Sequence, residues 1–298
     1  MRIPLVFLAV AVGALLIGFG RGDGSSSRPQ IVATTTEAAD LARNVAGDRA
    51  EVRSLLTPDS DPHEYEPRPG DIDALTGADL VLRSGGDLDE WFDGAIESAG
   101  GGAPVLDLLD EVGAERGDPH WWQDPRRAEQ AVGTIETALS VADPEGADGY
   151  AERARAYEAR LRELDAGVAR CIDGIPEAQR KLVTTHDALG YYADRYGLEV
   201  IGTVIPALTT QAQASAGDLA KLSATIRRER VRAIFAESAV NAKIEKAIAR
   251  ETGARVGEPL WADSLGPEKS SGATYVDSIR ANTAAITRGL TGRSCSPR

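Results

Sequence analysis

The segment of residues 144–172 contains no strand-like run, and it constrains the fold more than any other part of the chain. Apolar side chains recur there at intervals of three and four residues from Tyr150 to Cys171, while arginines such as Arg153 and Arg162 lie off this stripe. A helix of roughly 25 residues is about 38 Å long. We therefore predict one long amphipathic helix that is stiff enough to join two halves of a protein.

Strand-like and helix-like runs alternate on both sides of this helix. Before it, the predicted strands are 31–36, 50–56, 79–86 and 103–109, followed by a helix at 125–142. After it, the predicted strands are 181–187, 198–205, 232–238 and 254–260, with a final helix at 274–290. This order favours mainly parallel sheets covered by helices. We predict an α/β protein with an N-terminal lobe, a connecting helix and a C-terminal lobe, at 28–143, 144–172 and 173–298.

Length and charge narrow the classes of function. A chain of 298 residues with 42% hydrophobic content is about right for two lobes of ordinary domain size. The formal net charge of −13 disfavours a nucleic-acid partner, because phosphate binding needs clustered cations. An acidic surface instead raises the local concentration of cations, although this effect is weak and unspecific.

Residues 1–27 have the composition of a targeting segment. Arg2 precedes an apolar run from Ile3 to about Phe19, and Arg21 and a Gly/Ser stretch end that run. The pattern resembles a secretory signal peptide or an uncleaved anchor followed by a linker, because about 17 to 18 apolar residues are at the lower limit for spanning a bilayer. A buried core helix is the alternative. We expect an exported protein, in the periplasm or at the outer face of the cytoplasmic membrane.

The chain has two cysteines, Cys171 and Cys295. Neither lies near the end of the apolar N-terminal run, so the usual bacterial lipid attachment is not available. In an exported protein the two cysteines could form a disulfide bond, and the alternative is two unpaired thiols. Closing a loop of over a hundred residues would stabilise the fold by roughly 4 to 5 kcal/mol in the chain-entropy model.

All three histidines of the chain follow predicted strands. His63 lies in the loop DPHEYEP and His120 in the similar loop DPHWWQDP, while His186 stands at the carboxyl end of the strand 181–187. Asp263, in WADSLG, directly follows the strand 254–260. Ligands of open α/β sheets bind beyond the carboxyl ends of the strands. Two facing lobes would therefore bring these four side chains into one cleft.

Three imidazoles and one carboxylate make a closed set of four ligands for a divalent metal, with metal–nitrogen distances of about 2.0–2.1 Å for zinc. Pro62 and Pro119 restrict the backbone just before two of the histidines, so that less entropy is lost when the side chains are fixed. Asp61 and Asp118 are candidates to accept the second ring N–H of a liganding imidazole.

Each residue also has an ordinary structural explanation. A loop histidine can be a solvated polar residue, His186 a hydrogen-bonded core residue, and Asp263 a helix cap. Glu237 ends a strand, and we interpret it as an N-terminal cap or a polar cleft residue rather than a ligand. The aromatic residues beside the histidines wall the cleft or pack in it, and the acids of the first loop belong to its surface or outer contacts: Trp121, Trp122, Tyr191, Glu64 and Glu66.

The order of motifs resembles a known family. DPHEYEP, DPHWWQDP, TTHDALGYYADRYGL, SAGDLAKL, FAES and WADSLG with TY at 274–275 occur as in the metal-binding solute receptors of bacterial zinc and manganese ABC importers. The resemblance runs from about residue 30 to 290. It implies two α/β lobes joined by one rigid helix, a metal held at their interface, and delivery of that metal to a membrane permease. By motif, the ligands fall on His63, His120, His186 and Asp263.

The resemblance also implies a monomeric, non-enzymatic receptor, and the family is associated with cell adhesion. Two features depart from it. The cysteine through which members are often lipid-anchored is missing, and the interval from His63 to His120 lacks the histidine-rich loop of many zinc-type members.

Three nitrogens and one carboxylate suit Zn²⁺ better than Mn²⁺, which prefers more oxygen donors, although an added oxygen ligand would make Mn²⁺ possible. The rival interpretation is a zinc hydrolase with Glu64 as general base. The sequence carries no helical His-Glu-x-x-His signature and no Gly-x-Ser-x-Gly elbow. A third interpretation is an adhesion module with a structural metal.

Overall fold

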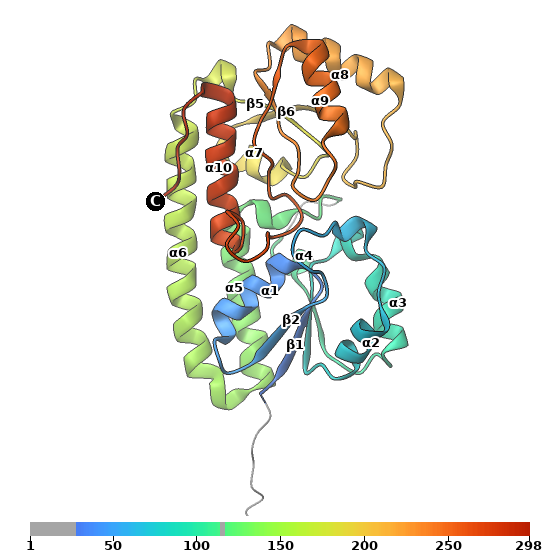
Figure 1. Cartoon of the computed structure of the whole chain (residues 1–298). Coiled ribbons are helices and arrows are strands. Elements are labelled where there is room, and N and C mark those ends of the chain that lie inside the picture. Colours follow the sequence, from blue (N-terminus) through green and yellow to red (C-terminus); the bar gives the residue numbers. More distant parts are fainter. Residues whose placement is uncertain (1–27, 114–116) are drawn as a thin grey trace, which may run out of the picture.

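The computed structural model describes residues 28–113 and 117–298, so the predicted signal peptide or anchor at 1–27 lies outside the described residues. Two α/β lobes are stacked one above the other, and the helix α6 runs along one side of both (Figure 1). No helix within the described residues is long and apolar enough to cross a membrane.

The sheet of the N-terminal lobe has four parallel strands in the order β2-β1-β3-β4. These strands confirm the four predicted ones but are shorter: β1 (Gln30–Ala33), β2 (Glu51–Ser54), β3 (Leu80–Arg83) and β4 (Val105–Asp107). The strand β4 ends early because the Asp107 side chain accepts hydrogen bonds from the backbone N–H groups of Leu109 and Asp110, which starts the short helix α4 (Leu108–Glu111).

Helices cover both faces of this sheet, and alternate strand residues point to opposite sides. Ile31 and Ala33 are buried in the large core that contains α1 (Thr36–Ala46) and α5 (Pro125–Ala142). Val32 is buried with Leu75 of α2 (Pro69–Thr76) and Phe92 of α3 (Trp91–Ser98). Burial on both faces is what a parallel sheet requires.

The predicted long helix is α6 (Ala147–Asp173), which a single 3₁₀ turn at Pro144–Gly146 precedes. Its apolar stripe is buried, including Tyr150, Leu161 and Val168. The stripe packs against α5, α1 and the last helix, α10 (Tyr275–Thr291). The helix is therefore a packed wall of both lobes and not a free-standing spacer.

The C-terminal lobe repeats the α/β pattern with shorter strands. The pairs β5–β6 and β7–β8 are both parallel, and a parallel bridge between Thr184 and Phe235 joins them. The strands predicted at 232–238 and 254–260 shrink because beyond Ile234 the two segments meet only at one further bridge, Glu237–Leu260. The elements are β5 (Lys181–Thr184), α7 (Gly190–Tyr196), β6 (Glu199–Thr203), α8 (Ala216–Glu229), β7 (Ala233–Ile234), α9 (Lys243–Thr252) and β8 (Arg255–Val256).

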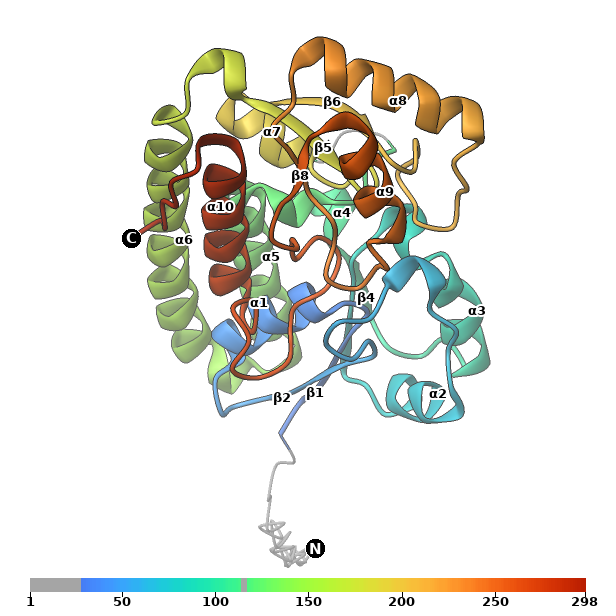
Figure 2. The same ribbon diagram turned by 45° about the horizontal axis from the view of Figure 1, so that its top comes forward.

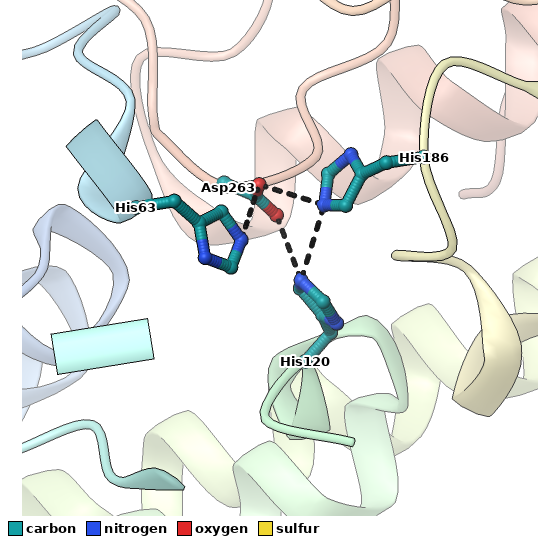
Figure 3. A group of neighbouring side chains, drawn as sticks. All are labelled: His63, His120, His186 and Asp263. Carbon is teal, nitrogen blue, oxygen red and sulfur yellow. Dashed lines mark hydrogen bonds and ion pairs between the residues drawn. The ribbon is translucent and has the colours of Figure 1, made fainter. Parts of the chain in front are cut away.

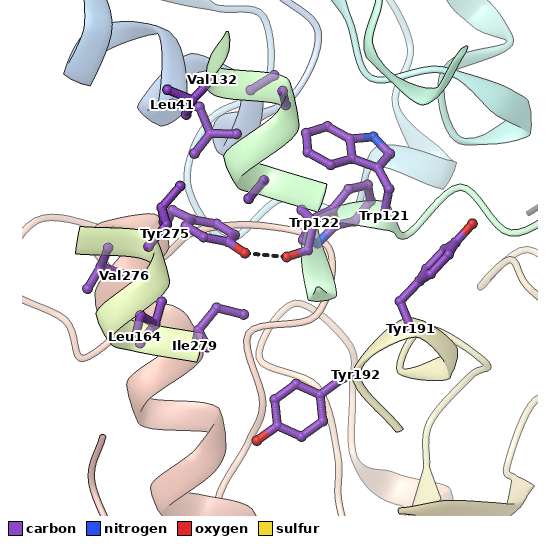
Figure 4. Packing of buried hydrophobic residues seen from close by; sticks show 14 of the residues in the cluster. Leu41, Trp121, Trp122, Val132, Leu164, Tyr191, Tyr192, Tyr275, Val276 and Ile279 are labelled. Atoms are coloured by element: carbon purple, nitrogen blue, oxygen red, sulfur yellow. Dashed lines mark hydrogen bonds between the residues drawn. The ribbon is translucent and has the colours of Figure 1, made fainter. Parts of the chain in front are cut away.

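The last helix, α10, lies beside α6 in both views (Figures 1 and 2). Its first residue, Tyr275, is buried in the core next to α1 and α5 (Figure 4). The Tyr275 backbone N–H donates to Asp40 Oδ2 at 3.0 Å, and the Tyr275 hydroxyl donates to the Trp122 carbonyl at 2.6 Å. These hydrogen bonds hold the first turn of α10 against the N-terminal lobe.

A disulfide bond joins Cys171 of α6 to Cys295, as the export interpretation allowed. The Cα–Cα distance of 5.6 Å lies within the usual range for disulfides of about 4.4–6.8 Å. Beyond Cys295 the tail runs close to α6 at Gly167, where an added Cβ would lie 2.9 Å from the Cβ of Pro297. The disulfide therefore pins the C-terminal tail to the long helix.

A buried acid in α1 makes stability depend on pH. Burial raises the pKa of Glu37 from 4.5 to about 8, and Thr36 supplies a hydrogen bond. Between pH 4.5 and about pH 8, Glu37 keeps its proton in the folded chain and has lost it in the unfolded chain, so the free energy of unfolding falls as pH rises. We expect Glu37→Gln to raise the stability of the metal-free protein at pH 8, on the order of a few kcal/mol, and to change it little at pH 4.5.

Thermal melting with a chelator present at both pH values measures this difference. The exposed Glu97 of α3 provides the matched control, since Glu97→Gln should shift melting equally at the two values. A Glu37→Gln protein that is less stable than the parent at pH 8 would contradict the prediction.

Candidate metal centre

The structure brings together all four residues that were predicted as ligands (Figure 3). His63 lies on a 3₁₀ turn after β2, His120 precedes the turn Trp121–Gln123, and His186 follows β5. Asp263 lies on the loop between β8 and α10. Two side chains come from each lobe, so the cluster lies where the lobes meet, and all four residues are buried.

The nitrogen and oxygen atoms of the cluster have the spacing of ligands around one ion. Asp263 Oδ2 lies 3.1 Å from His186 Nε2 and 3.5 Å from His63 Nε2, and Asp263 Oδ1 lies 3.5 Å from His120 Nε2. The Nε2 atoms of His120 and His186 are 3.3 Å apart, and all four ligand atoms lie within 4.8 Å of one another. A tetrahedron with zinc–ligand bonds of about 2.0–2.1 Å has edges of about 3.3 Å.

Two atoms of the cluster lack a hydrogen bond. His63 Nε2 and Asp263 Oδ1 are buried and have no hydrogen-bond partner among the described residues. A buried polar atom without a partner costs free energy, roughly 1–3 kcal/mol each. A cation at the centre of the cluster would satisfy both atoms.

Carboxylates contact the Nδ1 atoms of two of the three imidazoles and so orient the rings. Asp118 Oδ1 lies 2.8 Å from His120 Nδ1, and Glu237 Oε1 lies 2.8 Å from His186 Nδ1. Such a contact places the proton on Nδ1 and leaves Nε2 free to bind a metal. The prediction for Asp118 is therefore confirmed.

The prediction for Asp61 is wrong. Asp61 Oδ1 accepts a hydrogen bond from the backbone N–H of His63 at 3.0 Å, which closes a tight turn, and Asp61 Oδ2 accepts one from the Thr210 hydroxyl at 2.6 Å. Asp118 Oδ1 accepts the equivalent bond, from the backbone N–H of His120 at 3.0 Å, and still contacts the imidazole, so the bond from Thr210 is what distinguishes Asp61. The near-duplicate sequences DPH at 61–63 and 118–120 give different side-chain contacts because only the first meets Thr210.

Glu237 is a polar residue of the site, as one of its two interpretations held, but it does not cap the helix α9, whose N-cap is Ala242. Its contact with His186 was not predicted, and its place at the end of a strand was the only signal. Glu64 and Glu66 are exposed, as expected for loop surface.

The tryptophans beside His120 pack in the core and also tie the site together. The Trp121 indole donates to the Ser84 carbonyl at 3.0 Å, and the Trp122 indole donates to the Ala262 carbonyl at 2.8 Å. Gln123 donates to the same Ala262 carbonyl at 2.6 Å. The turn after His120 therefore holds the residue before Asp263 in place.

Tyr191 of α7 connects the C-terminal lobe to the His120 loop. Its hydroxyl donates to the backbone carbonyl of Asp118 at 3.1 Å, and the Arg127 guanidinium lies 4.5 Å from its ring centroid. Tyr191 thus supports the loop that carries His120 rather than forming part of the ligand cluster.

The charges of the cluster depend on one another. Burial raises the pKa of the Asp263 carboxyl, but the positive charges of His186 and His120 outweigh burial and hold that pKa well below its usual range. Burial lowers the pKa of the His186 imidazole, but Asp263 and Glu237 outweigh it and hold that pKa well above its usual range. The site therefore stabilises positive charge at its centre, which a divalent metal can supply in place of protons.

Comparison with known proteins identifies the family. Residues 31–289 match the family of the periplasmic zinc-uptake complex component A, ZnuA. The chain belongs to the ZnuA family. This confirms the resemblance to metal-binding solute receptors of ABC importers, and the two-lobed fold agrees with it.

Individual relatives match most of the chain but are named for different metals. The manganese-binding lipoprotein MntA of Bacillus subtilis is 32% identical, with 90% of this chain and 92% of that protein covered. The iron-binding protein YfeA of Yersinia pestis is 30% identical, with 97% and 96% covered. The solved structure of the zinc-binding protein TroA of Treponema pallidum is 30% identical, has a TM-score of 0.83, and is matched over 89% of this chain and 99% of that one.

Proposed function

We propose that the protein captures a divalent transition metal outside the cytoplasmic membrane, with Zn²⁺ as the preferred cargo, and delivers it to an ABC permease. The observation that carries this proposal is the buried cluster of His63, His120, His186 and Asp263, whose ligand atoms face one another at the lobe interface. Membership of the ZnuA family supports the transport role.

The donor set supports zinc over manganese. Three imidazole nitrogens and one carboxylate match the usual tetrahedral zinc site, whereas Mn²⁺ prefers more oxygen ligands. Zinc also binds more tightly than manganese at a generic nitrogen and oxygen site. The names of the relatives include manganese and iron, so the binding experiment below compares two metals.

A closed set of four protein ligands supports a receptor rather than a hydrolase. Catalytic zinc usually has three protein ligands and an open position for water. Glu64, the base that a hydrolase would use, is exposed and makes no hydrogen bond to the cluster among the described residues. We therefore propose a non-enzymatic protein that releases its metal unchanged.

We propose further that the receptor works as an exported monomer, with residues 1–27 serving as signal peptide or membrane anchor. The lobes would extend over 28–143 and 173–298, with the connecting helix between them. Several relatives are named as lipoproteins, whereas this chain has its two cysteines in a disulfide, so a different mode of anchoring is part of the proposal.

Isothermal titration of the metal-stripped protein with Zn²⁺ and, separately, Mn²⁺ tests the proposal. We expect one metal per chain and a lower dissociation constant for Zn²⁺. Tighter binding of Mn²⁺ would make manganese the cargo, and the absence of binding by either metal would contradict the receptor function.

The carboxylate behind His186 should tune the affinity. We expect Glu237→Gln to lower the affinity for Zn²⁺ about 10- to 100-fold. The Glu237 carboxylate fixes the tautomer of the His186 imidazole and raises its basicity, and a neutral amide does neither. The same titration measures the change. Glu268→Gln, at an exposed position on the loop after Asp263, is the control and should bind as the parent does. Parental affinity in Glu237→Gln would show that this contact has no part in metal binding.

A further inference from the structure

The three histidines of the centre are held in different ways. His120 and His186 each have a carboxylate on Nδ1 and are 0% exposed. His63 has no such carboxylate contact on Nδ1 among the described residues, and its side chain is 1% exposed, so its ring is buried like the other two. His63 is therefore the one histidine of the centre whose ring no carboxylate restrains at Nδ1 among the described residues.

The position of His63 depends instead on its loop, which the opposite lobe holds through four hydrogen bonds. The backbone N–H of Asp59 donates to the Leu265 carbonyl at 2.9 Å, and that of Ser60 donates to Ser264 Oγ at 3.2 Å. The other two bonds come from the loop between β6 and α8. The Thr210 hydroxyl donates to Asp61 Oδ2 at 2.6 Å, and the Gln211 side-chain amide donates to the His63 carbonyl. We name Thr210 and Gln211 the latch.

The latch is itself fixed to the part of the C-terminal lobe that carries His186. The Ile205 N–H donates to the Thr185 carbonyl at 2.7 Å, and the Asp187 N–H donates to the Ala207 carbonyl at 3.0 Å. These bonds pin the start of the latch loop on both sides of His186. The latch thus links the loop of one ligand to the backbone around another ligand across the lobe interface.

A metal that four buried side chains enclose can leave only when at least one ligand moves away. His63 is the histidine that can move at the lowest cost, because among the described residues no carboxylate contacts its Nδ1 and its position depends on the loop bonds. Breaking the two latch bonds frees the His63 end of that loop, whereas the bonds at Asp59 and Ser60 lie further from the ligand in sequence.

We propose that Thr210 and Gln211 are positioning residues that set the rate at which His63 leaves the metal, and hence the rate of metal release. This inference rests on the proposed function, since it concerns exchange at the same site. In it, the latch opens before the lobes separate, and His120, His186 and Asp263 hold the metal until the last step.

The test measures how fast the zinc-loaded full chain gives up Zn²⁺ to an excess of a chromophoric chelator. We expect Thr210→Val, which keeps the shape of the side chain, and Gln211→Ala each to speed release about tenfold, the effect of one net hydrogen bond. Gln213→Ala is the matched control, because Gln213 is exposed on the same loop and makes no hydrogen bond among the described residues. Release from Thr210→Val/Gln211→Ala at the parental rate would overturn the proposal.

Hydrogen–deuterium exchange of the metal-free protein gives a second readout that needs no metal. The double variant should exchange faster over residues 59–65 and at the parental rate over 181–186. Unchanged exchange over 59–65, or equal acceleration in both segments, would contradict a local latch. A parent protein that binds no metal would instead defeat the proposed function, while this exchange experiment would still test the latch.

Discussion

Replacing Asp263 with asparagine should lower the affinity for Zn²⁺ at least about a hundredfold and leave the metal-free protein folded. Asp263 is the one residue of the cluster whose oxygens lie within 3.5 Å of all three imidazoles. Asparagine keeps the shape of the side chain but removes the only negative charge among the four ligands. Binding free energies of about 10–16 kcal/mol for structural zinc sites come from four ligands together, so loss of the charged one should cost about 3 kcal/mol or more.

Isothermal titration with Zn²⁺ measures this change, and thermal melting without metal checks the fold. Asp194→Asn, an exposed position on α7 with no hydrogen bond or ion pair among the described residues, is the control and should bind zinc as the parent does. An Asp263→Asn protein with parental affinity would show that the carboxylate is not a ligand. An unfolded Asp263→Asn protein would also contradict the prediction, and Asp263→Glu would then measure the ligand role.

Replacing both cysteines with serine should lower the free energy of unfolding by about 4–5 kcal/mol. The disulfide closes a loop with a sequence separation of 124 residues, and the chain-entropy model assigns a stabilisation of this size to so long a loop. Cys171 on α6 and Cys295 in the tail are the two cysteines of the chain, so this one double substitution removes all of the stabilisation by disulfides.

Urea unfolding of Cys171→Ser/Cys295→Ser in the presence of a chelator measures the loss. The reduced parent protein is the control, and its unfolding midpoint should match that of the double variant. Zinc affinity should stay at the parental value, because the disulfide joins the last turn of α6 to the tail beyond α10, and none of the four candidate ligands lies on these segments. Equal midpoints for the oxidised parent and the double variant would contradict the prediction.

The parts of the fold that depend on local periodicity could be predicted from the sequence. The stripe from Tyr150 to Cys171 predicts α6 to within a few residues. The strands at 232–238 and 254–260 are predicted too long. A strand ends where the adjacent strand is no longer close enough to continue the hydrogen-bond ladder, and beyond Ile234 these two segments meet only at the bridge Glu237–Leu260. The spacing of hydrophobic residues in the sequence does not indicate where two strands move apart.

The candidate ligands could be predicted because strand ends collect on one side of a sheet, a rule that applies to His186 and Asp263 without knowledge of their contacts. The hydrogen bonds around these ligands could not be predicted from the sequence. Asp61 and Asp118 occupy the same place in repeated motifs, yet only Asp118 reaches an imidazole, and Asp61 bonds Thr210 across a sequence separation of 149 residues. Such pairings depend on how the lobes are set against each other, which no local pattern records.

X-ray absorption at the zinc edge, on protein loaded with one equivalent of Zn²⁺, identifies the side chains that bind the metal. A centre built from His63, His120, His186 and Asp263 predicts three imidazole nitrogens and one carboxylate oxygen at about 2.0–2.1 Å. It also predicts the loss of one imidazole from the spectrum of His120→Ala. A spectrum with fewer than three imidazoles in the parent protein, or one that His120→Ala leaves unchanged, would contradict a metal centre built from these four residues.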